Sequence, residues 1–216
     1  MKNNNKIFLC EFIASCFLVM IIVGSGIMAE NLTNDNAVRL LANTIATGAG
    51  LFVLITSFAN ISGAHLNPFV SLSMYLTKRI KGKELLTFIP AQILGCLLGV
   101  MLANVFFEHS IIELSTKNRD GFHIFLSEIV ATFGLIFIIF ATLKDGKTTV
   151  AACVATYISA GYWFTSSTSF ANPAVAIART FTDSFTGINY LNTPTYIFAE
   201  LLGAIVAIYI IKRLIK

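Results

Sequence analysis

The sequence predicts an all-α membrane protein made of two inverted repeats, each with three membrane-spanning helices and one shorter half-helix. Three observations support this prediction. Hydrophobic residues make up 56% of the 216-residue chain, charged residues only 12%, and mean hydropathy is +0.79. A soluble domain carries about 25% charged residues. The pair Asn-Pro occurs twice, at residues 67–68 and 172–173, and the two halves of the chain share a sequence pattern.

Six apolar runs are long enough to cross a bilayer, which takes about 20 helical residues. They cover residues 7–29, 37–59, 84–106, 122–142, 147–166 and 194–211. The first run is too long for the core of a signal peptide, and no small-residue cleavage site ends it, so we expect it to remain as the first helix. A soluble helical protein needs no runs of this length, so the chain is predicted to be a polytopic membrane protein.

Each Asn-Pro pair opens a shorter segment between two spans, over residues 61–78 and 167–182. Asn is a favoured helix N-cap, and Pro is favoured at the first helical position. Both segments are too short and too polar at their start to cross the bilayer. Such backbone is tolerated at membrane depth only where protein buries it or it lines a wet cavity. We therefore predict two re-entrant half-helices whose N-termini meet near the bilayer centre.

The two halves of the chain repeat each other. Residues 11–18 and 128–135 both fit Glu-x-x-Ala-(Ser/Thr)-x-x-Leu. In the third span of each half, Ala-Gln-Ile-Leu-Gly at 91–95 matches Ala-Glu-Leu-Leu-Gly at 199–203. Three spans per half is an odd number, so the second half is inverted in the membrane. Inverted repeats commonly place their site at the midplane, where broken helices meet.

The distribution of basic residues predicts which way the chain faces. With the N-terminus in the cytoplasm, only Arg39, Lys117, Arg119 and Arg179 fall outside. The other basic residues then face the cytoplasm: Lys2, Lys6, Lys78, Arg79, Lys81, Lys83, Lys144, Lys147, Lys212, Arg213 and Lys216. This excess satisfies the positive-inside rule. Both termini are therefore expected in the cytoplasm, and the net charge of +4 needs no nucleic-acid partner.

The chain resembles the aquaporin, or major intrinsic protein, family in two motifs and two glutamates. The motifs are Ser-Gly-Ala-His-Leu-Asn-Pro at residues 62–68 and Asn-Pro-Ala at residues 172–174. The glutamates are Glu11 and Glu128, which open the two repeats. The resemblance covers nearly the whole chain and implies an aquaporin-like fold of six transmembrane helices and two half-helices.

The resemblance also implies one channel domain over residues 1–216, with a first repeat over about 1–107 and a second over about 122–216. It implies a pore in each subunit, a homotetramer in the cell inner (plasma) membrane, and passive flow of water or small neutral solutes. Asn67 and Asn172 would offer amide donors to a passing solute, with Ala174 beside them. The N-termini of the half-helices would disfavour cations.

Glu11 and Glu128 lie in transmembrane helices, where an ionisable group indicates a functional role by default. The resemblance implies a structural role instead: both would accept backbone N–H bonds from the loops that lead into the half-helices. A proton relay is the alternative. Glu200 stands in the slot that Gln92 fills in the first repeat, which weakens a proton-coupled mechanism. His65 is expected to brace the first loop and line the inner pore.

The sequence departs from the family pattern after both motifs. Phe69 stands where the family usually has Ala, and it either narrows the inner vestibule or packs. Val175 stands where the family usually has Arg. Arg179 lies one helical turn further, about 6 Å along the axis. It either carries the positive charge in the outer vestibule or pairs with Asp183, its (i, i+4) neighbour.

Counted from each Asn, the family's outer constriction falls on Thr47, Ala160, Ser169 and Val175, with Gly161 as the alternative to Ala160. Water-selective members typically have an aromatic residue, a His, a small residue and the Arg at these positions. Here all four are small and uncharged. We therefore expect a wider, neutral ring that lacks a guanidinium donor array and favours solutes larger than water.

Residues 163–175 resemble a bacterial subgroup of the family associated with arsenic-resistance operons. The expected function is a passive channel for polyols such as glycerol and metalloid hydroxides such as arsenous acid, with some water. A water-selective channel is the alternative within the fold, and a proton- or ion-coupled secondary transporter is the alternative outside it. An enzyme is not expected, because the sequence contains no recognisable nucleophile–base set and no phosphate-binding loop.

The cysteines give no indication of a cofactor or a metal site. All of them lie inside apolar segments, and no Cys-x-x-Cys pair or His cluster accompanies them. We expect them to be core residues rather than metal ligands or disulfides: Cys10, Cys16, Cys96 and Cys153.

Overall fold

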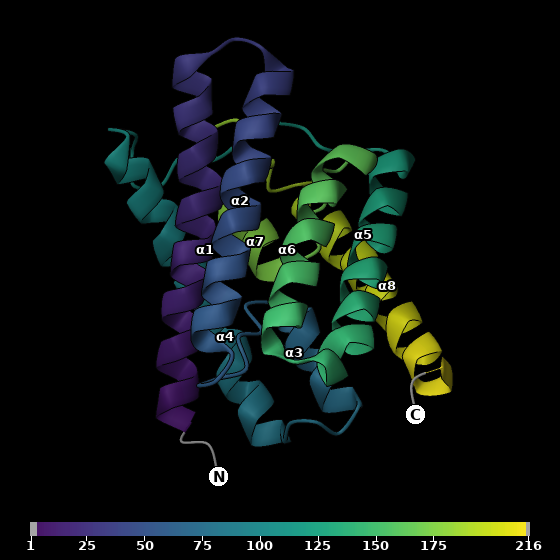
Figure 1. Cartoon of the computed structure of the whole chain (residues 1–216). Coiled ribbons are helices and arrows are strands. Elements are labelled where there is room, and N and C mark those ends of the chain that lie inside the picture. Colours follow the sequence, from purple (N-terminus) through teal and green to yellow (C-terminus); the bar gives the residue numbers. More distant parts are fainter. Residues whose placement is uncertain (1–3, 215–216) are drawn as a thin grey trace.

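The computed structural model describes residues 4–214, and its regular elements over that range are all helical (Figure 1). Lys2 and Lys216, which contribute to the expected orientation, lie outside the described residues. The elements are α1 (Asn4–Leu32), α2 (Asn36–Phe58), α3 (Pro68–Leu76), α4 (Gly82–Phe106), α5 (Phe122–Thr142), η1 (Leu143–Asp145), α6 (Lys147–Phe164), α7 (Pro173–Ala178), η2 (Arg179–Phe181) and α8 (Thr193–Leu214).

The predicted fold class is confirmed. Five helices are long and apolar enough to cross a membrane: α1, α2, α4, α5 (extended through η1) and α8. The sixth expected span corresponds to α6, which has 18 residues, begins at Lys147 and packs beside α2 and α5. The two expected half-helices are α3 and α7, of 9 and 6 residues.

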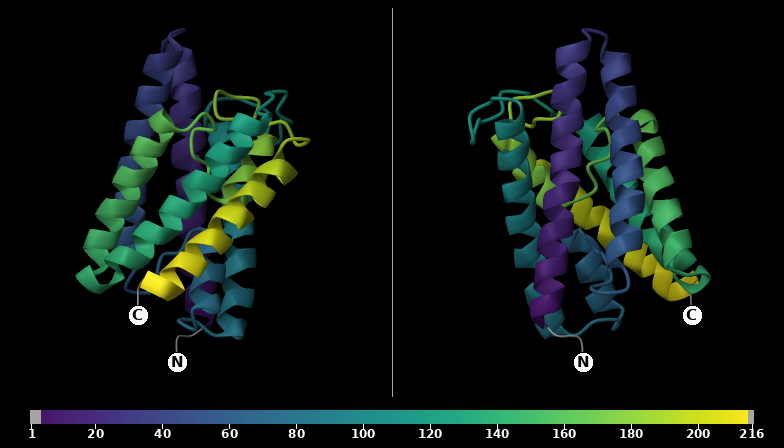
Figure 2. Two further views of the ribbon diagram at one scale, coloured as in Figure 1. Left: turned by 90° about the vertical axis from the view of Figure 1, so that its right-hand side faces the viewer. Right: turned by 60° about the vertical axis from the view of Figure 1, so that its left-hand side comes forward.

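The long helices form a bundle around α3 and α7. The start of α1 and the end of α8 lie at the same end of this bundle in all views (Figures 1 and 2). At the opposite end, the hairpin between α1 and α2 extends beyond the other helices (Figure 2). The half-helices contact each other and come from different halves of the chain, so residues distant in sequence meet in the interior.

The two halves pack in the same way. The most extensive helix pairs are α1 with α4 in the first half and α5 with α8 in the second. Each pair makes its close approach at a glycine on the second helix. A Cβ on Gly95 would collide with the backbone carbonyl of Phe12, and a Cβ on Gly203 would collide with that of Ile129. Because Phe12 and Ile129 directly follow the two repeated glutamates, this contact fixes what stands beside each glutamate.

Both half-helices begin at their Asn-Pro motif, as predicted. The Asn67 side chain caps α3 by accepting hydrogen bonds from the N–H groups of Phe69 and Val70. The Asn172 side chain caps α7 in the same way. Pro follows each cap at the first helical position, where its missing N–H costs nothing. The motif therefore sets where each half-helix starts.

The cysteines form no disulfide among residues 4–214. Cys10, Cys16 and Cys96 are buried, and Cys153 is partly buried. Among residues 4–214, no group of three or more His, Cys, Asp or Glu side chains is arranged to hold a metal ion.

Candidate functional site

The loops leading into the half-helices have the same unusual backbone. Residues three and one before each Asn have positive φ: Ala64 (51°) and Leu66 (54°) in the first loop, Ser169 (54°) and Ala171 (48°) in the second. None of these is Gly, so the conformation costs about 1–2 kcal/mol at each position. The surrounding structure must compensate for this strain.

Glu11 and Glu128 hold these loops. Glu11, fully buried in α1, accepts hydrogen bonds from the N–H groups of His65 (3.1 Å) and Leu66 (2.8 Å). Glu128, fully buried in α5, accepts them from Phe170 (2.9 Å) and Ala171 (2.8 Å). The positions are equivalent in the two repeats. The glutamates therefore have the geometry that the family resemblance implies, with the N–H groups bonded to carboxylate oxygens in place of water.

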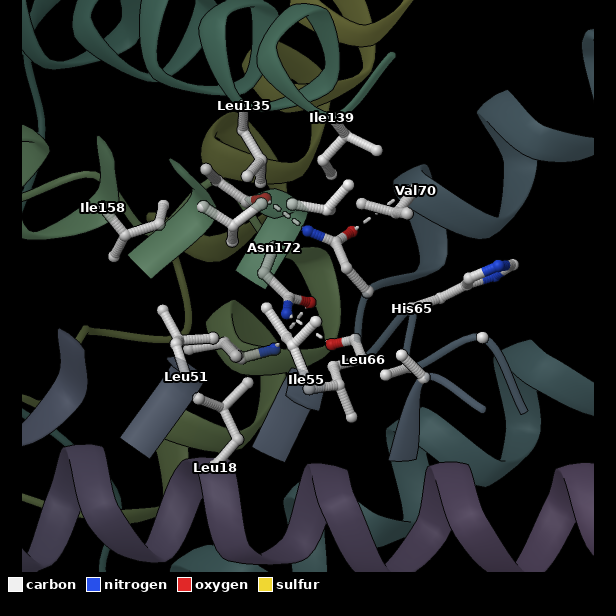
Figure 3. Close-up of a pocket in the computed structure, with 18 of the residues that line it drawn as sticks. Leu18, Leu51, Ile55, His65, Leu66, Val70, Leu135, Ile139, Ile158 and Asn172 are labelled. Atoms are coloured by element: carbon white, nitrogen blue, oxygen red, sulfur yellow. Dashed lines mark hydrogen bonds between the residues drawn. The ribbon is translucent and has the colours of Figure 1, made fainter. Parts of the chain in front are cut away.

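The two asparagines bind each other's loops. Asn67 Nδ2 donates to the carbonyl of Ala171 (2.6 Å), and Asn172 Nδ2 donates to the carbonyl of Leu66 (2.8 Å; Figure 3). Each amide NH₂ carries two hydrogens. One is used in this reciprocal bond, and both asparagines line a cavity. The second hydrogen of each is thus available to a solute in that cavity.

The cavity has a volume of about 320 Å³ and a mainly apolar wall with polar groups at its centre. Figure 3 shows Leu18, Leu51, Ile55, Leu135 and Ile139 around Asn172. An apolar wall gives a hydroxylated solute few partners outside the central amides. Such a solute would bind weakly and leave easily, as conduction requires.

All charged side chains of the cavity wall are cationic. Arg79 and Lys147 line it near the end of the bundle where α1 starts, and Arg179 lines it beyond α7. Within residues 4–214, no Asp or Glu contributes to this wall. The N-termini of α3 and α7 add partial positive charge at the centre. The potential along the cavity therefore disfavours cations.

Three of the four expected constriction residues line the cavity: Thr47, Ser169 and Val175. The expectation for Ala160 is wrong, since its side chain is exposed on the outer face of α6. The alternative, Gly161, is buried but does not line the cavity either.

Helical geometry explains the error at Ala160. Val154, Ile158 and Tyr162 recur every fourth residue along α6, and all three line the cavity. Ala160, halfway between two of them, must face the other way. The Tyr162 hydroxyl donates to Thr47 Oγ1 (3.1 Å), so an aromatic side chain stands where the sequence predicted a small one. The four-residue spacing of these residues marks the side of α6 that faces the cavity, which a count back from Asn172 does not show.

Arg179 does not pair with Asp183. Its Nε donates to the carbonyl of Thr186, and its guanidinium lies 3.5 Å from the centre of the Phe170 ring. Asp183 instead accepts the N–H of Thr116 (2.8 Å). The Arg179 side chain is buried by protein and lines the cavity. The cavity wall therefore carries a buried positive charge beyond the ring that the sequence predicts to be neutral.

Arg119, which the distribution of basic residues predicts on the outer side, also lies in this outer region. Its side chain donates to the carbonyls of Gly187 (2.8 Å) and Phe185 (3.0 Å). Its guanidinium lies 5.5 Å from the centre of the Phe170 ring. Burial lowers the pKa of the Arg119 side chain from its ordinary value. Together Arg119 and Arg179 hold three successive carbonyls of the outer loop, a long-range arrangement with no local sequence signal.

The remaining expected residues pack beside the cavity or brace it. The imidazole of His65 lies 3.0 Å from Ser71 Oγ at Nδ1 and stacks on Phe88, with ring centres 4.2 Å apart. His65 also contributes to the cavity wall. Phe69 and Ala174 are buried but do not line the cavity. For Phe69, this favours packing over narrowing of the inner vestibule.

Comparison with known proteins shows the family of this chain. Residues 1–164 match the family model for the major intrinsic protein family, which is more than half of the chain. The chain belongs to the major intrinsic protein family. It is 46% identical over 206 residues to aquaglyceroporin AqpS from Rhizobium meliloti (strain 1021), an alignment that covers 95% of this chain and 88% of that protein.

More distant family members match as well. Aquaporin-4 from Rattus norvegicus is 28% identical over 94% of this chain, which spans 65% of that protein's length. Among solved structures, the aquaglyceroporin from Plasmodium falciparum superposes with a TM-score of 0.79 at 20% identity, covering 99% of this chain and 97% of that one. This last similarity supports the aquaporin-like fold.

Proposed function

We propose that this member of the major intrinsic protein family is a passive channel for small neutral solutes: polyols such as glycerol, metalloid hydroxides such as arsenous acid, and some water. The observation that carries the proposal is the reciprocal pair of Asn67 and Asn172 in a cationic, largely apolar cavity. Hydroxylated neutral solutes accept the amide hydrogens, whereas cations meet a repulsive potential. The 46% identity to an aquaglyceroporin supports the same solute class.

The proposed selectivity region is the outer part of the cavity. Val175 takes the place of the usual Arg and removes a long donor side chain from the ring. Thr47 and Ser169 are small, and Tyr162 supplies one aromatic wall. Such a ring admits solutes larger than water, and the resemblance to arsenic-operon channels makes arsenous acid the metalloid to test.

We assign Arg179 a role at the outer mouth within this proposal. Its Nε donates a hydrogen bond to the carbonyl of Thr186, and its guanidinium lies over the ring of Phe170. These two contacts hold the guanidinium in one place. Within residues 4–214, its only side-chain hydrogen bond is the one to Thr186. The terminal nitrogens can then donate to two oxygens of a solute, which suits a polyol or an oxyacid. The fixed charge also repels cations at the mouth.

The proposed setting is the inner (plasma) membrane of a bacterial cell, with both termini in the cytoplasm. The excess of basic residues on that side supports this orientation. The start of α1 and the end of α8 lie at the same end of the bundle in Figures 1 and 2, which is consistent with it. We further propose that residues 1–216 form one channel domain with two repeats and that the channel assembles as a homotetramer, as the family resemblance implies.

Solute flux into proteoliposomes tests the proposal. Water and glycerol flux are measured by stopped-flow light scattering, and arsenous acid uptake is measured in parallel. Wild type is compared with Val175→Arg and with Val175→Leu, which enlarges the side chain without adding a charge. We expect the wild type to conduct all three solutes, and Val175→Arg to suppress glycerol and arsenous acid while sparing water.

Other results would favour the alternative functions. Flux of water alone would indicate a water-selective channel. Saturable uptake that depends on an ion gradient would indicate a coupled transporter. If Val175→Arg changed nothing, the constriction would lie elsewhere in the cavity and the proposed selectivity region would be wrong.

A further inference from the structure

The two repeats differ at one buried position beside the glutamates, and this difference has a chemical consequence. In the first repeat, Gln92 Nε2 donates to Glu11 Oε2 (2.9 Å). In the second repeat, Glu200 occupies the matching slot beside Glu128. We propose that Glu200 is a neutral carboxylic acid that shares its proton with Glu128 and, in that form, positions Asn172 in the pore.

Helix packing forces the two carboxyl groups together. The α5–α8 contact at Gly203 has the same geometry as the α1–α4 contact at Gly95, three residues after Glu200 and Gln92 respectively. Glu200 therefore faces Glu128 as Gln92 faces Glu11, and the two carboxyl groups accept the adjacent backbone N–H groups of Ala171 and Asn172. Both side chains are 0% exposed.

The bonds around the pair leave one oxygen for the shared proton. Both Glu128 oxygens accept backbone N–H groups, from Phe170 and Ala171. Glu200 Oε1 accepts the next one, from Asn172 (2.9 Å). Glu200 Oε2 is buried and has no protein donor among residues 4–214. A proton on Glu200 Oε2 would donate to a Glu128 oxygen, as the Gln92 amide donates to Glu11.

Two negative charges at this site would be expensive, because neighbouring carboxylates in a buried site cannot both ionise easily. The arginines nearby do not relieve the repulsion by contact. Arg119 and Arg179 bond the carbonyls of the outer loop, and neither forms an ion pair with Glu128 or Glu200 in the described chain. The first repeat needs only one carboxylate for the same task.

Other ionisable groups face the pair from the elements packed against it. Those near enough to influence Glu128 are Arg119, Arg179, Tyr157 and Tyr196. The tyrosines are neutral at physiological pH and the arginines remain charged. In this proposal, the carboxyl group of Glu200 is therefore the group of this cluster that can gain or lose the shared proton.

The consequence for the pore is a dependence on that proton. Three successive N–H groups, those of residues 170–172, are held by the two carboxyl groups, and the last belongs to the pore-lining Asn172. Loss of the proton would place two like charges in contact and push α8 from the loop. The backbone N–H of Asn172 would then lose its acceptor, Glu200 Oε1. Glu200 is a positioning residue in this account, because it acts on the solute through Asn172.

Infrared spectroscopy of the full-length protein in lipid tests the proposal directly. At neutral pH, the wild type should show the C=O stretching band of a buried protonated carboxyl group. Glu200→Gln should fold, because the Gln92 amide donates to Glu11 in the matching slot of the first repeat. The variant should lose the band, because it has no carboxyl group at position 200. The reciprocal variant Gln92→Glu should gain a second band, from a new carboxyl pair with Glu11. Absence of the band in the wild type, or its persistence in Glu200→Gln, would overturn the proposal, as would failure of Glu200→Gln to fold.

Glycerol flux as a function of pH provides the functional readout, which rests on the proposed function. Raising the pH should lower the flux of the wild type, and this loss should be absent in Glu200→Gln. A pH profile that is identical in the two proteins would contradict the positioning role. If neither protein conducts glycerol, the proposed function fails, whereas the infrared result still decides the protonation of Glu200.

Discussion

Gly203 is the position where a single added carbon most clearly tests the helix packing. In Gly203→Ala, the new Cβ would collide with the carbonyl of Ile129, lie 3.0 Å from the backbone nitrogen of Phe133 and lie 3.1 Å from Thr132 Cβ. Optimal contacts between non-bonded carbons lie at about 3.5–4.0 Å. Two of the three neighbours are backbone atoms, which cannot rotate away. Helix α8 must therefore move away from α5.

Two opposing terms set the size of the effect. Replacing a helical Gly by Ala contributes about 1 kcal/mol in helix propensity. Overpacking a well-packed interior costs about 1–3 kcal/mol. Because backbone atoms oppose the new carbon at Gly203, we expect the upper part of this range and a net loss of about 2 kcal/mol. The shift of α8 should also lengthen the bond between Glu200 and the Asn172 N–H, now 2.9 Å.

Gly24→Ala provides a matched control. Gly24 also lies inside a helix, α1, but a Cβ there would meet only Phe107 Cε2 at 3.5 Å, an ordinary contact. It should stabilise the protein by up to about 1 kcal/mol. Thermal unfolding in detergent micelles should thus shift in opposite directions for the two variants, and glycerol flux should fall only in Gly203→Ala. Equal unfolding temperatures for the two variants would refute the account of helix packing.

Three further predictions concern the loops and the outer mouth. Glu11→Ala removes the acceptor of three buried donors, the Ser62 hydroxyl, the Leu66 N–H and the Gln92 amide, so thermal unfolding should show a loss of about 1–3 kcal/mol for each; unchanged stability would contradict the role of Glu11. Arg179→Met keeps a long side chain but removes the charge, so proteoliposomes should leak more potassium while glycerol flux persists; an unchanged leak would exclude the proposed role at the mouth. Tyr162→Phe removes only the hydrogen bond to Thr47, worth about 0.5–1.5 kcal/mol. It should therefore lower the unfolding temperature slightly and leave water flux intact, and a blocked pore would show that Tyr162 does more than form a wall.

The elements of the fold that follow from local patterns could be predicted from the sequence. The expected spans agree with the long helices to within a few residues at most ends, because apolar runs and flanking polar residues mark where a helix leaves the bilayer. The half-helices were predictable because Asn-Pro combines a cap with the residue that suits the first turn. The repeated glutamates were found because their positions recur in both halves.

The parts of the site that depend on distant contacts were not predictable in this way. Counting residues back from Asn172 predicts Ala160, but the loop before Asn172 bends through residues with positive φ and gives no fixed register with α6. The sequence predicts that Arg179 either pairs with Asp183 or carries its charge in the outer vestibule. In the structure, its side chain donates to the carbonyl of Thr186 and lies over the ring of Phe170. Neither partner is marked by spacing along the helix.

Cysteine labelling along α6 tests most directly whether solutes pass through the cavity between Asn67 and Asn172. Ile158 lines this cavity and Ala160, two residues away, faces outward. Glycerol flux of Ile158→Cys and Ala160→Cys is measured before and after treatment with a small thiol reagent, with the wild type as the control for the native cysteines. We predict that the reagent blocks Ile158→Cys and spares Ala160→Cys and the wild type. Block of Ala160→Cys, or continued flux through labelled Ile158→Cys, would contradict passage through this cavity.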